Sequence, residues 1–134
     1  MFNQQDAKLS ASIALPNGAA TVNSAVIDIQ NSASGDFLAG CEFVIEAPAL
    51  TVGQLPNSQT MTYSLTQSDD PAFGSSEILS QNTLVQLGAD GAGAALAEAR
   101  FRPPTNVKRY VRLSVTKGGA GDASGVSASL SLRV

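Results

Sequence analysis

The stretch VKRYVRLSV, residues 107–115, alternates aliphatic side chains such as Val111 and Leu113 with polar ones. A period of two is typical of a β-strand with one buried face and one solvated face. Arg109 is the exception, because it falls on the apolar side near the start of the stretch. The end of the chain, VSASLSLRV at 126–134, repeats the alternation, and the glycine-rich residues 117–125 between the two stretches favour a loop. We therefore predict one long antiparallel hairpin.

Six earlier segments also have strand patterns. Their residue ranges are 9–15, 24–30, 41–47, 60–67, 79–87 and 95–102. In 24–30 the alternation predicts that Ala25, Ile27 and Ile29 share the buried face. The strand in 79–87 is expected to be shorter and centred on residues 84–87. Residues 95–102 have helical propensity, but their alternation and the following Pro103-Pro104 favour a strand.

About eight short strands separated by turn sequences are typical of an all-β fold. Pro16-Asn17-Gly18 is one such turn. We predict an antiparallel β-sandwich of the jelly-roll type, which uses eight strands in two sheets. Residues 1–8 are expected to form an extended N-terminal arm, and residues 9–134 a single domain.

The charge balance excludes several classes of partner. The net charge is −3 and only 14% of the 134 residues are charged, so the basic footprint of a nucleic-acid-binding protein is missing. No apolar run is long enough to span a membrane, and the N-terminus lacks the pattern of a signal peptide. We expect a soluble chain made in the cytosol. The single Cys41 excludes an internal disulfide and is interpreted as a small buried hydrophobe.

The residues that usually carry catalysis are scarce. The chain has no His, which removes the commonest general base and metal ligand. The glycines of residues 88–93 lack the Lys-Ser/Thr pair of a phosphate loop. The adjacent pair Asp69-Asp70 supplies too few oxygens for calcium, and Glu42 and Glu46 are interpreted as solubilising charges. The sequence therefore predicts no enzyme, no cofactor and no metal.

Positive charges gather around Pro103-Pro104. The residues predicted to make contact with another protein are Arg100, Arg102, Lys108, Arg109, Tyr110 and Arg112, with Phe2 on the arm. If two neighbouring strands carry these cations, they form a docking patch for an acidic protein surface. The alternative is a rim of solvated charges that pair with acids such as Glu98. Under the first interpretation, Arg112→Glu is expected to weaken docking without changing the melting temperature.

Short motifs along most of the chain resemble one known family. They are Leu15-Pro16-Asn17-Gly18, Ile27-Asp28-Ile29, Phe43-Val44-Ile45 with Ala47-Pro48-Ala49-Leu50, Arg102-Pro103-Pro104, and Lys108-Arg109-Tyr110-Val111-Arg112-Leu113. The chain resembles the small jelly-roll head-decoration, or capsid cement, proteins of tailed bacteriophages. The resemblance implies a homodimer or homotrimer that binds the major capsid protein on the outside of the virion, after assembly in the cytoplasm of the bacterial host. It transfers no catalytic residue.

Two other functions compete with a structural role in the virion. A carbohydrate- or receptor-binding jelly roll would need exposed aromatic rings for stacking, and the sequence offers few beyond Tyr63 and Tyr110. An enzyme would need a converging set of acid, base or nucleophile, which the residue content disfavours.

Overall fold

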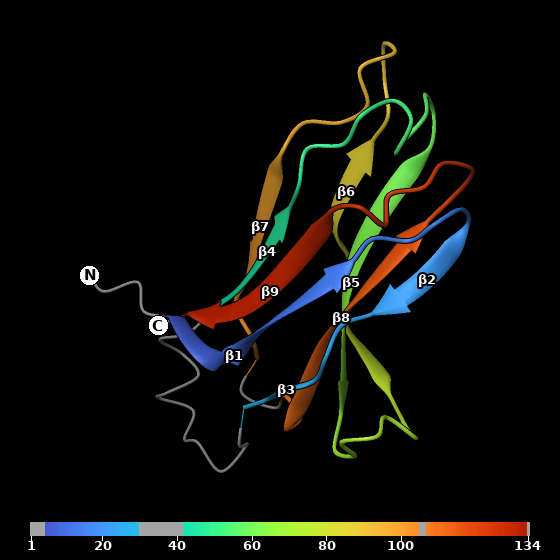
Figure 1. Cartoon of the computed structure of the whole chain (residues 1–134). Coiled ribbons are helices and arrows are strands. Elements are labelled where there is room, and N and C mark those ends of the chain that lie inside the picture. Colours follow the sequence, from blue (N-terminus) through green and yellow to red (C-terminus); the bar gives the residue numbers. More distant parts are fainter. Residues whose placement is uncertain (1–4, 30–41, 105–106, 134) are drawn as a thin grey trace.

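Two antiparallel sheets face each other in the computed structural model of the chain, which describes residues 5–29, 42–104 and 107–133 (Figure 1). The described residues contain nine strands and no helix. The strands are β1 (Gln5–Ala14), β2 (Ala20–Asn23), β3 (Ile27–Asp28), β4 (Glu42–Ala47), β5 (Thr60–Ser68), β6 (Glu77–Leu87), β7 (Ala97–Phe101), β8 (Tyr110–Lys117) and β9 (Ser127–Arg133). The predicted all-β sandwich is confirmed.

Strands from the two ends of the chain pair with each other. One sheet, called the β9 sheet, has the order β1-β9-β4-β7, and the other, the β8 sheet, has the order β2-β8-β5-β6 with β3 also on β8. The pairs are nested about the turn between β5 and β6: β4 pairs with β7, β2 and β3 pair with β8, and β1 pairs with β9. The start of β1 and the end of β9 therefore lie side by side (Figure 1).

The core lies between the sheets and is built from the alternating aliphatic positions. Val111, Leu113 and Val115 of β8 are fully buried, as are Leu130 of β9 and Leu65 of β5. Burying each such side chain contributes roughly 1.5–3 kcal/mol to folding. The strand predicted at residues 60–67 is confirmed by β5, in which Met61, Tyr63 and Leu65 are buried.

The predicted hairpin of residues 107–115 and 126–134 is wrong. β8 and β9 both form, but they belong to opposite sheets, and the chain between them crosses from one sheet to the other. Alternation determines which side of a strand is buried and carries no information about its neighbour. Both strands instead pair with strands from earlier in the chain, β1 and β4 for β9, and β2, β3 and β5 for β8.

The boundaries of several other strands differ from the prediction. β2 lies in a segment with no strand pattern, because its side chains are mostly exposed. The strand expected at 24–30 shrinks to Ile27–Asp28, and Ala25 is exposed instead of sharing the buried face of Ile27 and Ile29. β6 is longer than expected because it begins at Glu77. The choice of strand over helix at 95–102 is confirmed by β7.

The N-terminal segment is part of the sandwich from Gln5 onward. Gln5 is paired with Arg133, so the described part of the predicted arm belongs to β1. Residues 1–4, which include Phe2, lie outside the described residues, and so does Cys41.

A partly buried polar network joins the two sheets where β6 lies beside β7. The Tyr63 hydroxyl donates to Gln86 Oε1 at 2.6 Å, and Gln86 Nε2 donates to the carbonyls of Pro48 (2.9 Å) and Ala95 (3.0 Å). Burial raises the pKa of Tyr63, so this hydroxyl stays protonated and serves as a donor. Gln86 therefore binds one buried hydroxyl and two partly buried carbonyls from three different segments, and it holds the edges of the two sheets together.

We expect Gln86→Leu to lower the free energy of unfolding by about 2–4 kcal/mol, because it leaves a hydroxyl and two carbonyls without their partner. Tyr63→Phe should have a smaller effect, since it removes only one donor. Urea denaturation measures both, and Gln81→Leu, at an exposed position of the same strand, is the control. Equal stability of Gln86→Leu and Gln81→Leu would contradict this role.

Candidate functional site

The predicted cation cluster is divided between the two sheets. Arg100 lies on β7 and Arg102 directly follows that strand, whereas Lys108 and Arg109 lead into β8, which holds Arg112. The prediction that neighbouring strands bring these cations together is wrong, because β7 and β8 belong to opposite sheets. Tyr110 begins β8, and Phe2 lies outside the described residues.

Acidic side chains from distant strands pair with the cations at the start of β8. Arg109 binds both carboxylate oxygens of Asp28, at 2.9 and 3.0 Å. Lys108 binds Glu77 at 2.9 Å and lies 3.7 Å from Asp69. Hydrogen bonds to Glu77 and Asp28 raise the pKa of Lys108 and of Arg109, respectively. These two cations therefore match the alternative of a solvated rim of ion pairs.

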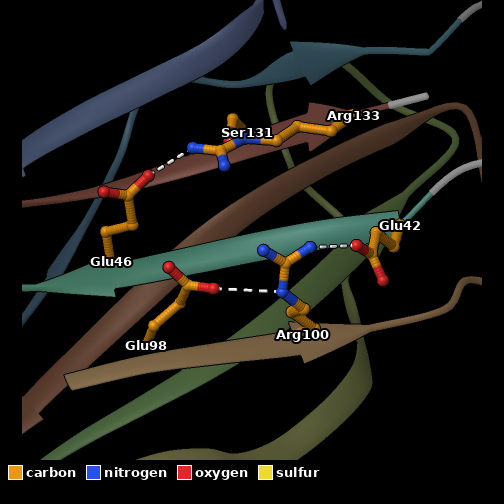
Figure 2. Close-up of polar contacts among 6 residues, drawn as sticks. All are labelled: Glu42, Glu46, Glu98, Arg100, Ser131 and Arg133. Atoms are coloured by element: carbon orange, nitrogen blue, oxygen red, sulfur yellow. Dashed lines mark hydrogen bonds and ion pairs between the residues drawn. The ribbon is translucent and has the colours of Figure 1, made fainter. Parts of the chain in front are cut away.

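The outer surface of the β9 sheet carries a second set of ion pairs, shown in Figure 2. Arg100 binds Glu42 on the neighbouring strand β4 and Glu98 on its own strand, and the first of these bonds is the main cause of its raised pKa. Arg133 of β9 binds Glu46 of β4 and donates to Ser131 Oγ at 3.1 Å. We call this surface the ion-pair face. Its members are Glu42, Glu46, Glu98, Arg100 and Arg133.

The ion-pair face has its own buried layer. Val44 lies between Glu42 and Glu46 on the outward side of β4, yet it is 0% exposed. In the ladder Val44 lies between Arg100 of β7 and Ser131 of β9, and Ser131 is 2% exposed. Long arginine stems commonly cover apolar surface in this way. The charges on this face are therefore engaged with one another and with the sheet beneath them.

The outer surface of the β8 sheet has a different chemistry. Its outward positions alternate with the core residues of β5 and β8. We call it the hydroxyl face, and its members are Thr21, Thr60, Thr62, Ser64, Thr66, Ser114 and Thr116. Thr21 and Thr116 share a hydrogen bond at 2.9 Å, and Ser114 donates to Asn23 at 2.6 Å. The sequence showed these residues only as the polar half of an alternation, so the surface they form was not predicted.

One cation borders the hydroxyl face. The Arg112 guanidinium stacks on the Phe73 ring, with 4.2 Å between Cζ and the ring centroid. Phe73 is nearly buried and belongs to the loop between β5 and β6. Arg112 Nε and Thr66 Oγ1 are buried without a hydrogen-bond partner, and the two residues are directly paired across β5 and β8. Within the described ranges, Arg112 has no ion pair, so its contact with Phe73 is its main interaction.

A buried lysine closes one end of the core. Lys117 faces inward at the end of β8 and is 1% exposed. Its Nζ donates to the carbonyls of Gly119, at 3.0 Å, and Ala120. Burial lowers the pKa of Lys117, because the charged ammonium loses its hydration. The side chain ties the loop after β8 to the end of the sheet, a role that its position beside a glycine run did not suggest.

The described part of the chain contains neither a candidate metal-binding group nor a helix that could span a membrane. It holds no group of three or more His, Cys, Asp or Glu side chains that could bind a metal ion. It also has no helix of the length and apolar character needed to cross a bilayer.

The structure changes the expectation for Arg112→Glu. We now expect this substitution to lower the free energy of unfolding by about 1–2 kcal/mol, because it removes the stacking on Phe73. The same substitution at the exposed Arg102 should have a smaller effect. Chemical denaturation compares the two variants, and an unchanged stability of Arg112→Glu would show that the Phe73 contact contributes nothing.

Lys117 predicts a specific pH dependence of stability. Its pKa in the folded chain is below the ordinary 10.5, so the unfolded chain binds this proton more tightly. The stability of the wild type relative to Lys117→Met should therefore rise as pH increases from the lowered pKa toward 10.5. Lys108→Met is the control of opposite sign. Because the folded pKa of Lys108 is raised, its contribution is constant below 10.5 and is lost above it. Parallel profiles for the wild type and Lys117→Met would contradict the burial of this charge.

Comparison with known proteins leaves the chain without an assigned family. No protein-family description matches the sequence, and no curated protein matches it either.

Proposed function

We propose that the chain is a structural protein that binds the outside of an assembled bacteriophage capsid and stabilises it. The resemblance of its motifs to head-decoration proteins suggests this role, and the β-sandwich is compatible with it. The partner in this proposal is the major capsid protein, and the location is the virion exterior. Weak contacts become effective in such a setting, because a lattice repeats them at high local concentration.

The strand order supports the finer assignment of a jelly roll. When β2 and β3 are counted as one interrupted strand, the described ranges contain eight strands that pair first with last and second with seventh. The third and sixth strands also pair, and so do the fourth and fifth. This arrangement is a single long antiparallel hairpin rolled into two sheets, and two-sheet, eight-stranded Greek-key folds belong to the jelly-roll class.

The contrast between the two outer faces carries the proposal. Charged residues are depleted in the buried centres of protein interfaces, because removing them from water is unfavourable. The ion-pair face holds five charged side chains, whereas the hydroxyl face is made of Thr and Ser with Arg112 at its border. Its hydroxyls can bond to a partner, and its threonine methyl groups can pack against one. We therefore assign shell binding to the hydroxyl face rather than to the predicted cation cluster.

The placement of four aromatic rings in the described ranges disfavours the carbohydrate-binding alternative. Tyr63 and Phe43 are fully buried, and Phe73 is nearly so under Arg112. Arg109 lies over the ring of Tyr110, with 5.1 Å between Cζ and the centroid. These rings are therefore engaged within the chain and do not form a platform for a sugar.

Co-sedimentation with assembled empty shells of the virus that encodes the chain tests the proposal. The wild type should pellet with shells and stay in the supernatant without them. Thr116→Lys places a charge on an exposed position of the hydroxyl face and should reduce binding at least about tenfold, since a buried unpaired charge is strongly unfavourable.

Ser12→Lys is the matched control, because Ser12 is exposed on β1 and points outward from the β9 sheet. It should bind like the wild type. Failure of the wild type to pellet with shells would contradict the proposed function. Equal binding of Thr116→Lys and the wild type, with loss in Ser12→Lys, would move the contact to the opposite face.

A further inference from the structure

The β6 edge differs from the other three sheet edges. Edge strands that stay free in solution are usually short, or carry charges or Pro that discourage pairing with another chain. β2 has four residues, β7 carries Glu98 and Arg100, and β1 contains Asp6 and Lys8. β6 has eleven residues, and its one charge, Glu77 at the first position, is paired with Lys108. Residues 78–87 contain neither charge nor Pro.

Exposed apolar side chains gather at this edge. Four of the five large hydrophobic residues exposed in the described ranges are Ile78 (59%), Val85 (47%) and Leu87 (58%) on β6, and Leu96 (74%) just before β7. The Gln86 side chain holds this corner together through its bond to Ala95, the neighbour of Leu96. The edge is thus apolar and bonded to the other sheet, and an exposed apolar surface is expected where another molecule binds.

The backbone of β6 has unused hydrogen-bonding groups beside these side chains. Gly88 N donates to Gln59 O at 2.9 Å, so the N–H of Gly88 is turned toward the β5 side. Along an antiparallel pair, successive residues alternately turn their N–H and C=O groups toward the partner strand and away from it. Val85 and Leu87, which are paired with Thr62 and Thr60, are therefore the positions that turn their N–H and C=O away from β5. A bulge around Asn82, which has a φ of 54°, limits the regular edge to residues 83–87.

We propose that β6 pairs antiparallel with β6 of a second copy of this chain about a two-fold axis near Val85 and Gln86. Such a pairing is isologous, so one strand must be complementary to itself. An axis at this place brings Val85 and Leu87 of one copy beside Val85 and Leu87 of the other on the outer surface. It opposes no like charges, because residues 78–87 are uncharged. It also supplies partners for the outward N–H and C=O groups, in the manner of β-augmentation.

A second copy of the chain can pair with the β6 edge more easily than with the other sheet edges. Two β7 strands could meet only by disturbing the bonds of Arg100 with Glu42 and Glu98. The β6 edge has no such competing contact within the described residues, apart from the ion pair of Glu77, which lies outside the paired stretch.

Light scattering coupled to size exclusion tests the proposal on the full chain. The wild type should have twice the 13.7 kDa mass of the chain and dissociate on dilution. Val85→Lys should shift the mass to that of one chain, because it places two like charges side by side at the axis. Val52→Lys is the matched control, since Val52 has nearly the same exposure (44%) but lies in the loop between β4 and β5. It should remain a dimer.

Amide hydrogen exchange tests directly whether two β6 strands pair. The amides of Val85 and Leu87 should exchange more than about tenfold slower in the concentrated wild type than in Val85→Lys or in the dilute wild type. A wild-type monomer at all concentrations would overturn the proposal, and so would an oligomer that survives Val85→Lys. Protection of these amides only after shell binding would also overturn it, by making a shell strand the occupant. None of these results depends on whether Thr116→Lys weakens shell binding, so this inference and the proposed function fail separately.

Discussion

The fold depends on nested antiparallel pairing between the two ends of the chain. β8 and β9 lie in the interior of opposite sheets, and each is flanked by strands from the first half of the sequence. Their aliphatic positions, such as Leu113 and Leu130, belong to the same core cluster. Neither sheet can form its central ladder before the last third of the chain has been folded against the first. Pairings between such distant segments are slow to form, so we expect both sheets to assemble together.

The same alternation that builds the core produces two unlike outer faces. On the β9 sheet the outward positions hold Glu and Arg from three adjacent strands, which form ion pairs with one another and surround the buried Val44. On the β8 sheet the outward positions of β5, and those of β8 after Arg112, hold Thr and Ser, whose hydroxyls bond partly to neighbouring side chains of β2. Exposed ion pairs contribute little to stability and resist desolvation, so the first face is suited to water. The second face is easier to bury against another protein.

The sequence predicted the features that are local and missed those that depend on partners. The buried positions of residues 60–67 follow from a period of two, which any strand in a sandwich shares. The neighbours of β8 and β9 could not be predicted, because they are set by pairing over long distances in the chain. The prediction of a cation cluster was wrong for the same reason. Asp28 and Glu77, which bind Arg109 and Lys108, are distant in sequence, and no local pattern connects them. The hydroxyl face could not be predicted without knowing that β2, β5 and β8 share one sheet.

The two proposals reinforce each other geometrically. A two-fold axis that relates adjacent antiparallel strands of one sheet runs perpendicular to that sheet, so it turns neither copy over. Pairing through β6 would therefore join two β8 sheets into one continuous layer, with both hydroxyl faces on the same side. A shell contact made by such a dimer is bivalent, and linking two weak contacts in this way can raise overall binding by roughly 10²–10⁴. An uncharged, weakly binding face is then sufficient, because the edge that pairs two copies multiplies its effect.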